Sequence, residues 1–361
     1  MNIAAIQRRV ISPPYIQSIK SSPRQSNIEL LRIISMFLVM LVHSMEGSLG
    51  RPTTEDLVHA PIDVLCRVNF ETLGLVCVNV FVLISGWFGI RCSIKGAVKF
   101  IYQCLFMAIV VVAFLAIMQG SLTWTELIRD LILPKNWWFV YAYFTLYILS
   151  PILNVFVEYA SREMFRNTLI AFLVFQTIYG FLYSLPYFAN GYSPLSFIGL
   201  YLLARYIHIY STRITKLSCK VCAMGYIGLS MGISFIMCLF LWQLPWQKVI
   251  GILFSLYICY TSPLNILASV LLLLCFSKIK LQSFWINKIA SSSFAVYLIH
   301  NHPAIHQGYF KPFVIWLHDN YSLYSFFILL FLFLVFLFLL CVVIDRLRIF
   351  TYRKISLWQR K

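Results

Sequence analysis

Long apolar runs separated by short polar segments dominate the chain. The run 326–344 is continuously apolar, and a helix that crosses a membrane needs only ~20 such residues. A membrane β-barrel would instead alternate apolar and polar residues over strands of ~10 residues. The pattern therefore predicts an all-α, polytopic integral membrane protein.

About ten segments are apolar enough to span. They cover residues 28–46, 71–90, 97–118, 137–156, 168–185, 194–210, 221–243, 261–277, 287–303 and 322–345. The stretch 248–260 is also apolar and is interpreted as a bent extension or a half-inserted helix rather than a further span. An even number of spans places both termini on the same side of the membrane.

The charges fit this prediction. Hydrophobic residues make up 61% of the 361-residue chain and charged residues 11%, yet the net charge is +17. If the amino terminus is cytoplasmic, most of the 29 Lys and Arg are also cytoplasmic, and the positive-inside rule is satisfied. The exceptions in the predicted outer loops are Arg51, Arg67, Arg129, Lys135, Lys248 and Lys311. The excess of Lys and Arg thus indicates the orientation of the chain in the membrane, and nucleic acid is not an expected partner.

Three regions follow. Residues 1–27 carry no apolar core typical of a cleavable signal peptide and are expected to form a cytoplasmic tail. Residues 28–345 form one membrane domain, and residues 346–361 form a basic cytoplasmic tail. Most of the ten cysteines fall in apolar spans, and Cys219 and Cys222 form a single C-x-x-C without a second pair. We expect neither a metal site nor a structural disulfide.

Two ionisable residues interrupt the first span. Arg32 and His43 are eleven positions apart, which is about three helical turns, so they share one face roughly 16 Å apart along the axis. A charge inside a membrane costs roughly 2.5–3.5 kcal/mol and usually marks a site that faces the bundle interior. One inward face of this helix therefore carries a cation in the inner half and an imidazole in the outer half.

Each of the two residues has a functional and a structural interpretation. A neutral His43 can act as a general base on a hydroxyl or accept an acyl group itself; the alternative is a hydrogen bond to a neighbouring helix. Arg32 can hold phosphate groups with its planar guanidinium; the alternative is an ion pair with Glu29, three residues earlier on the same face.

The chain resembles the acyltransferase 3 family of integral membrane acyltransferases. Arg32, ten intervening residues and His43 reproduce the family's arginine-x10-histidine motif. Residues 74–88 resemble its small second span that ends in Ser-Gly-aromatic, residues 136–154 its aromatic fourth span, and residues 292–303 its penultimate span. The resemblance covers residues 27 to about 345 in the expected order.

The resemblance implies a donor, acetyl-coenzyme A, on the cytoplasmic side, with Arg32 near the donor and His43 as the catalytic histidine. Glu29 stands where many relatives have an aspartate, so it is assigned with Arg32 to donor binding. The family acts on hydroxyls of surface polysaccharides and related acceptors, which implies an envelope or exported glycan acceptor and a bacterial cytoplasmic membrane. Acetyl is the family's commonest cargo, and longer groups such as succinyl remain open.

Four further residues are candidates for acceptor binding, and each has an alternative. His300 and His302 can position the acceptor or are interfacial polar residues before Pro303. Glu71 can bind the acceptor or pair with Arg67, four residues earlier. Trp138 can stack on a sugar or belong to an aromatic belt at the membrane surface.

The sequence thus predicts a membrane O-acyltransferase. The leading alternative is a transporter or a flippase for a lipid-linked glycan, in which Arg32 binds a phosphate and His43 relays protons. A membrane sensor or scaffold is a third class. Dependence on acetyl-coenzyme A distinguishes the enzyme from a transporter, and a sensor or scaffold would tolerate His43→Ala without loss of activity.

Overall fold

The structure is a computed structural model that describes residues 24–120, 137–210, 212–242 and 259–358. Most of the predicted amino-terminal tail, residues 248–258 of the additional apolar stretch, and the outer-loop residues Arg129, Lys135 and Lys248 lie outside the described residues.

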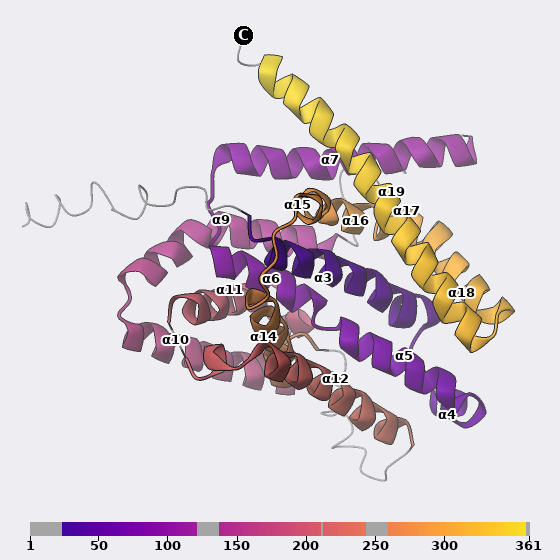
Figure 1. Cartoon of the computed structure of the whole chain (residues 1–361), viewed down its shortest axis with the longest axis horizontal. Coiled ribbons are helices and arrows are strands. Elements are labelled where there is room, and N and C mark those ends of the chain that lie inside the picture. The colour runs from indigo at the N-terminus through magenta and orange to yellow at the C-terminus, as the bar shows by residue number, and fades with distance from the viewer. Residues whose placement is uncertain (1–23, 121–136, 211, 243–258, 359–361) are drawn as a thin grey trace, which may run out of the picture.

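The described residues form helices joined by short connections (Figure 1). In chain order the helices are α3 (Ser26–Ser44), η1 (Met45–Leu49), α4 (Thr54–His59), α5 (Pro61–Gly74), α6 (Cys77–Phe88), α7 (Ile94–Gln119), α9 (Trp138–Tyr159), α10 (Arg162–Phe175), η2 (Gln176–Leu182), η3 (Ala189–Gly191), α11 (Pro194–Ile209), η4 (Ile214–Lys216), α12 (Cys219–Leu241), α14 (Pro263–Ser277), α15 (Phe284–Ala290), α16 (Ser293–His300), α17 (Pro303–Ile305), η5 (His306–Phe310), α18 (Lys311–Asn320) and α19 (Leu323–Trp358).

Seven of the helical segments in the described part of the chain are long and apolar enough to cross a membrane. They are Ser26–Leu49, Pro61–Phe88, Ile94–Met118, Trp138–Tyr159, Arg162–Leu182, Cys219–Leu239 and Leu323–Lys354. The predicted sixth and eighth spans are the shorter apolar helices α11 and α14. The all-helical, multi-pass prediction is therefore confirmed at this level.

The predicted ninth span is not one continuous helix. It is divided into α15 and α16, with a turn at Ser291 and Ser292 between them. The Ser291 hydroxyl donates to the Lys288 carbonyl at 2.7 Å, so this side chain satisfies a carbonyl at the end of α15. Helix α19 also continues past Arg346, where the sequence predicted the start of a tail, to Trp358.

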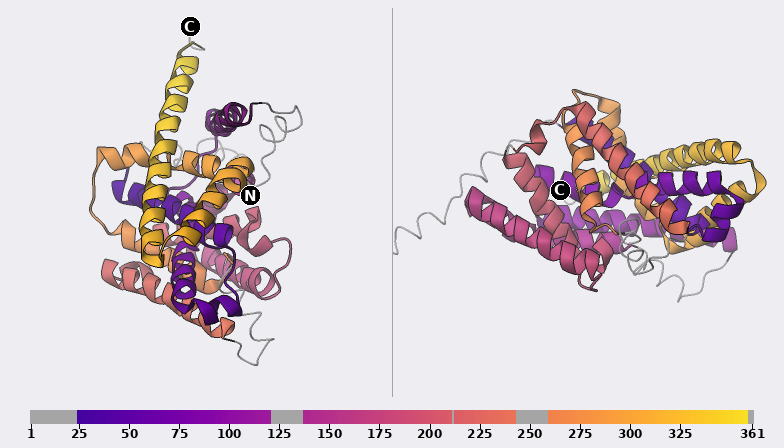
Figure 2. Two further views of the ribbon diagram at one scale, coloured as in Figure 1. Left: turned by 90° about the vertical axis from the view of Figure 1, so that its right-hand side faces the viewer. Right: turned by 90° about the horizontal axis from the view of Figure 1, so that it is seen from below.

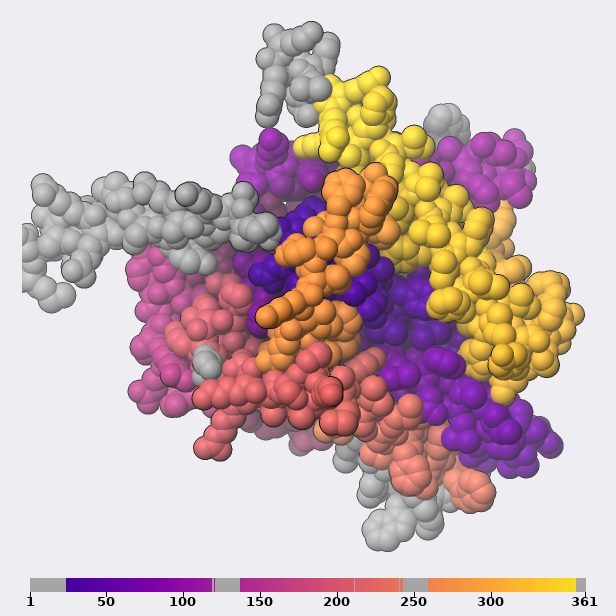
Figure 3. Space-filling view, viewed as in Figure 1, coloured from indigo at the N-terminus to yellow at the C-terminus, as the bar shows by residue number. Residues whose placement is uncertain are grey.

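Helix α3 occupies the centre of the bundle. It packs against α5, α6, α14, α15 and α16, and in Figure 3 its indigo surface is seen mainly between the orange and yellow C-terminal helices. Ile28, Leu31 and Met40 of α3 are fully buried. By contrast α7, α10, α12 and α19 expose many large apolar side chains, among them Ile109, Phe235 and Phe336. Such a surface suits lipid rather than water.

Close helix contacts and buried amides fix the neighbours of α3. A Cβ at Gly86 of α6 would lie 2.6 Å from the Tyr201 carbonyl oxygen, so glycine permits the approach of α11. The Asn79 amide donates to the Tyr260 carbonyl at 3.0 Å, which ties α6 to the turn before α14. Figure 2 shows the arrangement of the helices from two further sides.

Candidate active site

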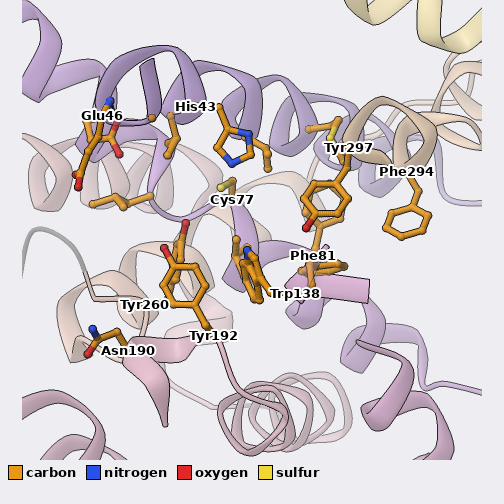
Figure 4. Close-up of a pocket in the computed structure, with 18 of the residues that line it drawn as sticks. His43, Glu46, Cys77, Phe81, Trp138, Asn190, Tyr192, Tyr260, Phe294 and Tyr297 are labelled. Carbon is orange, nitrogen blue, oxygen red and sulfur yellow. Dashed lines mark hydrogen bonds between the residues drawn. The ribbon is translucent and has the colours of Figure 1, made fainter. Parts of the chain in front are cut away.

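A cavity of about 280 Å³ lies along one face of α3. Met36, Val39, His43 and Glu46 line it at helical spacing, and Arg32 lies on the same face one turn below Met36. In Figure 4 Glu46 and Phe294 lie at opposite ends, and the His43 ring projects into the space between them. The imidazole is therefore accessible from the cavity although it lies within the bundle.

His43 is oriented by a second histidine. Its Nδ1 lies 3.0 Å from Nε2 of His300 in α16, and Nδ1 of His300 lies 2.6 Å from the backbone oxygen of Val296. The His300 side chain is fully buried. The sequence assigned His300 to the acceptor, whereas the structure places it directly against the candidate base.

The hydrogen bonds determine which nitrogens carry protons. A carbonyl oxygen can only accept, so His300 donates from Nδ1, and in the neutral ring its Nε2 must then be an acceptor. His43 consequently donates from Nδ1, which leaves its Nε2 with a lone pair. This is the form of imidazole that can remove a proton from a hydroxyl.

Two π-helical turns hold the backbone beside His43. Helix α3 continues into η1, where the Ser48 hydroxyl donates to the His43 carbonyl at 2.7 Å. His306, the first residue of η5, also hydrogen-bonds to the His43 backbone, and its ring centroid lies 5.7 Å from that of His43. Single π-helical turns are frequent at functional sites because they reorient side chains.

Charged residues gather at the Glu46 end of the cavity. Glu46 forms an ion pair with Arg51, and its backbone N–H donates to the Glu71 carboxyl group at 3.2 Å. Glu71 is 2% exposed and lines the cavity, as its assignment to acceptor binding requires. Arg67, its alternative partner in the sequence, forms its direct contacts elsewhere: it pairs with Asp63 at 3.3 Å and donates to the Gly50 carbonyl at 2.7 Å.

Aromatic rings form the wall opposite α3. Trp138 lines the cavity, and its ring contacts Tyr192 edge-on at 4.4 Å; Tyr192 in turn contacts Tyr260 at 5.2 Å. Gly191 has a φ of +100°, and a Cβ there would lie 2.4 Å from the Tyr260 Cβ. Glycine is therefore required where this wall is assembled.

Arg32 and His302 lie outside the cavity lining. The Arg32 guanidinium forms an ion pair with Glu29 at 2.6 Å, and this pair sits on the α3 face below the cavity. The ion pair that the sequence indicated as the structural role of Arg32 and Glu29 is thus present. His302 is fully buried, and its ring contacts that of Trp137 at 5.8 Å.

Several cavity residues had no signal in the sequence strong enough to single them out. Asn190, Tyr192 and Tyr260 come from turns distant in sequence, and the cavity wall they share depends on how α11 and α14 pack. In the sequence His306 is one of three closely spaced histidines, with His300 and His302, and nothing there indicates its contact with His43. Within the described residues no group of three or more His, Cys, Asp or Glu is arranged to hold a metal ion.

Comparison with known proteins identifies one family. Residues 25–346 match a family model for acyltransferase 3, which is described as an acyltransferase domain, and this match covers most of the chain. Neither the curated proteins nor the solved structures contain a significant match.

Proposed function

The chain belongs to the acyltransferase 3 family, and we propose that this membrane acyltransferase moves an acetyl group from cytoplasmic acetyl-coenzyme A to a hydroxyl of an envelope or exported polysaccharide. Family membership makes the protein an acyltransferase enzyme, and the transporter, flippase and sensor alternatives are set aside on that ground. The observation that supports the proposed chemistry is the hydrogen-bonded row from His43 through His300 to the Val296 carbonyl beside a cavity.

We infer that the two substrates enter from opposite ends. The donor approaches along the α3 face that carries Arg32 and reaches the end of the cavity near Phe294. The acceptor enters at the charged end near Glu46 and Glu71, with Trp138 as the surface on which a sugar ring stacks. His43 lies between the two ends, where the reacting groups would meet.

The transfer step uses the lone pair on His43 Nε2. This atom takes the proton of the acceptor hydroxyl while the hydroxyl oxygen forms a bond to the acetyl carbon. The carbon–sulfur bond of the thioester then breaks, and the departing thiolate takes the proton back from Nε2. Throughout, His300 accepts the hydrogen bond from His43 Nδ1 and holds the ring in the required orientation.

The proposed membrane arrangement follows the sequence. Ten spans with both termini in the cytoplasm place Arg32 in the inner half and His43 in the outer half of a bacterial cytoplasmic membrane. The seven long helices, the shorter α11 and α14, and the α15–α16 segment together provide the helical elements for this arrangement. His302 would then support the wall at Trp137 rather than touch the acceptor.

The test is transfer of radiolabelled acetyl from acetyl-coenzyme A into envelope glycan by inverted membrane vesicles that contain the native acceptor. We expect His43→Ala to lose label by a factor of ~100 or more, because general-base catalysis contributes roughly 10²–10⁴-fold. The matched control is His59→Ala, an exposed histidine in α4 that should transfer normally. Equal labelling by wild-type vesicles and by vesicles without the protein would refute the proposal.

A further inference from the structure

Basic side chains from separate parts of the chain gather at the inner end of the bundle. Lys99 of α7 lies within electrostatic range of Arg24, which precedes α3, and of Arg348 and Arg353 in α19. We call Arg24, Lys99, Arg348 and Arg353 the inner cation cluster. The negatively charged Asp345 of α19 also lies within electrostatic range of Lys99.

Hydrogen bonds hold the elements of this corner together. Arg24 Nη1 donates to the Asn287 carbonyl of α15 at 2.9 Å, and Arg346 of α19 donates to the Lys288 carbonyl of the same helix. Tyr102 of α7 hydrogen-bonds to Thr351 of α19 at 2.8 Å. In Figure 1 the ribbon of α19 crosses that of α7, in agreement with this bond. The cluster is therefore built on connected helices rather than on independent surface chains.

Arg348 is the most informative member. It is 2% exposed and donates to both carboxylate oxygens of Asp345, at 2.6 and 3.1 Å. Its Nη1 is buried and has no hydrogen-bond partner among the described residues. A buried guanidinium nitrogen without an acceptor is costly, and a ligand with oxygen acceptors would remove that cost.

The positive-inside rule accounts for many basic residues at the inner end, but it acts on exposed charges in loops. It gives no reason to bury a guanidinium group with one donor nitrogen unpaired. Oxygen atoms of a phosphate group, in contrast, suit both the fork of an arginine and the compact charge of a lysine.

We propose that the inner cation cluster binds phosphate groups, and that their source is the nucleotide end of the acyl donor. This rests on the proposed function for the identity of the donor, but not for the presence of the site. Arg32 precedes His43 along α3 by a helical rise of about 16 Å, and Arg24 lies just before the start of α3. A donor held by its phosphates at the cluster therefore extends past Arg32 toward the catalytic histidine.

The experiment measures equilibrium binding of adenosine 3′,5′-bisphosphate to the full-length protein in nanodiscs of neutral phosphatidylcholine. This probe carries phosphates but no thioester, so binding does not depend on acetyl transfer. We expect Lys99→Gln to weaken binding roughly ten-fold and the double variant Lys99→Gln/Arg353→Gln to weaken it further, as expected for charged hydrogen bonds. Both side chains are exposed, so these variants should fold.

The matched control is Lys95→Gln, an exposed lysine one turn earlier on α7, which should bind the probe as wild type does. His43→Ala should also bind normally, so that loss of transfer and loss of the phosphate site are separate results. If the wild type binds the probe and the double variant binds it with the same affinity, the proposal is overturned.

A second arm distinguishes the source of the phosphate. If the wild type does not bind the probe but retains phosphatidylglycerol from mixed nanodiscs more strongly than the double variant does, the phosphate site stands and its source is a lipid headgroup. If the probe does not bind and lipid retention is equal in the two proteins, the cluster is structural only and the proposal fails.

Discussion

The cavity around His43 and the inner cation cluster handle polar groups in opposite ways. In the cavity His43 and His300 are connected through one directional row of hydrogen bonds that ends at a backbone carbonyl. In the cluster Lys99 lies within electrostatic range of three arginines and of the Asp345 carboxylate, and one nitrogen of the Arg348 guanidinium is buried without a hydrogen-bond partner among the described residues. The first arrangement fixes the position of a proton, and the second brings several positive charges together.

The difference corresponds to two physical requirements. Proton transfer needs a heavy-atom separation of about 2.6–3.2 Å and a defined tautomer, so the side chains that set it must be locked. Attraction between charges falls off slowly with distance, so cations on separate helices can act together without a shared geometry. A proton-transfer site therefore favours side chains locked by hydrogen bonds, whereas a site that binds an anion can use cations from separate helices.

The strongest test of this contrast concerns His300. His300→Ala removes the acceptor for His43 Nδ1–H, and we expect the turnover rate to fall ~100-fold while the KM for acetyl-coenzyme A stays nearly unchanged. His300→Gln keeps an acceptor oxygen on a side chain of similar reach and should recover part of the rate. Steady-state kinetics of the purified protein provide both values.

Two results would contradict this role for His300. A raised donor KM with unchanged turnover would show that it contacts substrate rather than His43. Equal activity of the Ala and Gln variants would show that the hydrogen bond is dispensable.

The sequence predicted the residue types at the centre of the site better than their partners. Helical spacing alone placed Arg32 and His43 on one face of α3, because both belong to a single regular helix. The contact between His43 and His300 joins residues 257 positions apart, so local periodicity carries no information about it. Arg67 shows the same limit: its spacing from Glu71 allowed an ion pair, but the nearer geometry of Asp63 prevails.

For the fold, too, the sequence predicted some features and missed others. Long apolar runs predicted the seven long helices because each buries its backbone hydrogen bonds within itself. The apolar run 287–303 also suggested a continuous helix, yet the chain turns at Ser291 and Ser292. That turn allows α16 to bring His300 against α3, and it depends on tertiary packing rather than on hydropathy.

A second test concerns the pair that lies between the two regions. Arg32→Gln leaves the Glu29 carboxylate, which is 7% exposed, without its cation, and we expect a loss of about 1–2 kcal/mol in stability. The double variant Glu29→Gln/Arg32→Gln should recover most of this stability, because no uncompensated charge remains. Thermal unfolding of both variants in nanodiscs checks this expectation.

The same variants decide whether Arg32 also serves the donor. If it does, the KM for acetyl-coenzyme A stays raised in the double variant although stability has returned. A KM restored to the wild-type value would make the pair structural and would leave donor recognition to the inner cation cluster.

The smallest expected effect concerns an ion pair near the Glu46 end of the cavity. His318 of α18 lies with its Nε2 3.2 Å from the Asp63 carboxylate of α5, and Asp63 also holds Arg67. The hydrogen bond to Asp63 raises the pKa of His318 above its ordinary value, although burial of the ring opposes the shift. The stabilisation is therefore complete below the unfolded-state pKa of about 6.5 and is lost as pH rises through the raised folded-state value.

We expect the unfolding temperature of the wild type to fall by about 2 °C more between pH 6 and pH 8 than that of His318→Gln, which has no titrating group there. His59→Gln, at an exposed position, should retain the wild-type dependence. Identical pH dependence in wild type and His318→Gln would refute a role for this pair. Because Arg67 donates to the Leu49 and Gly50 carbonyls at the end of η1, a confirmed effect would show that the charged pair of His318 and Asp63 helps to stabilise the backbone beside the Glu46 end of the cavity.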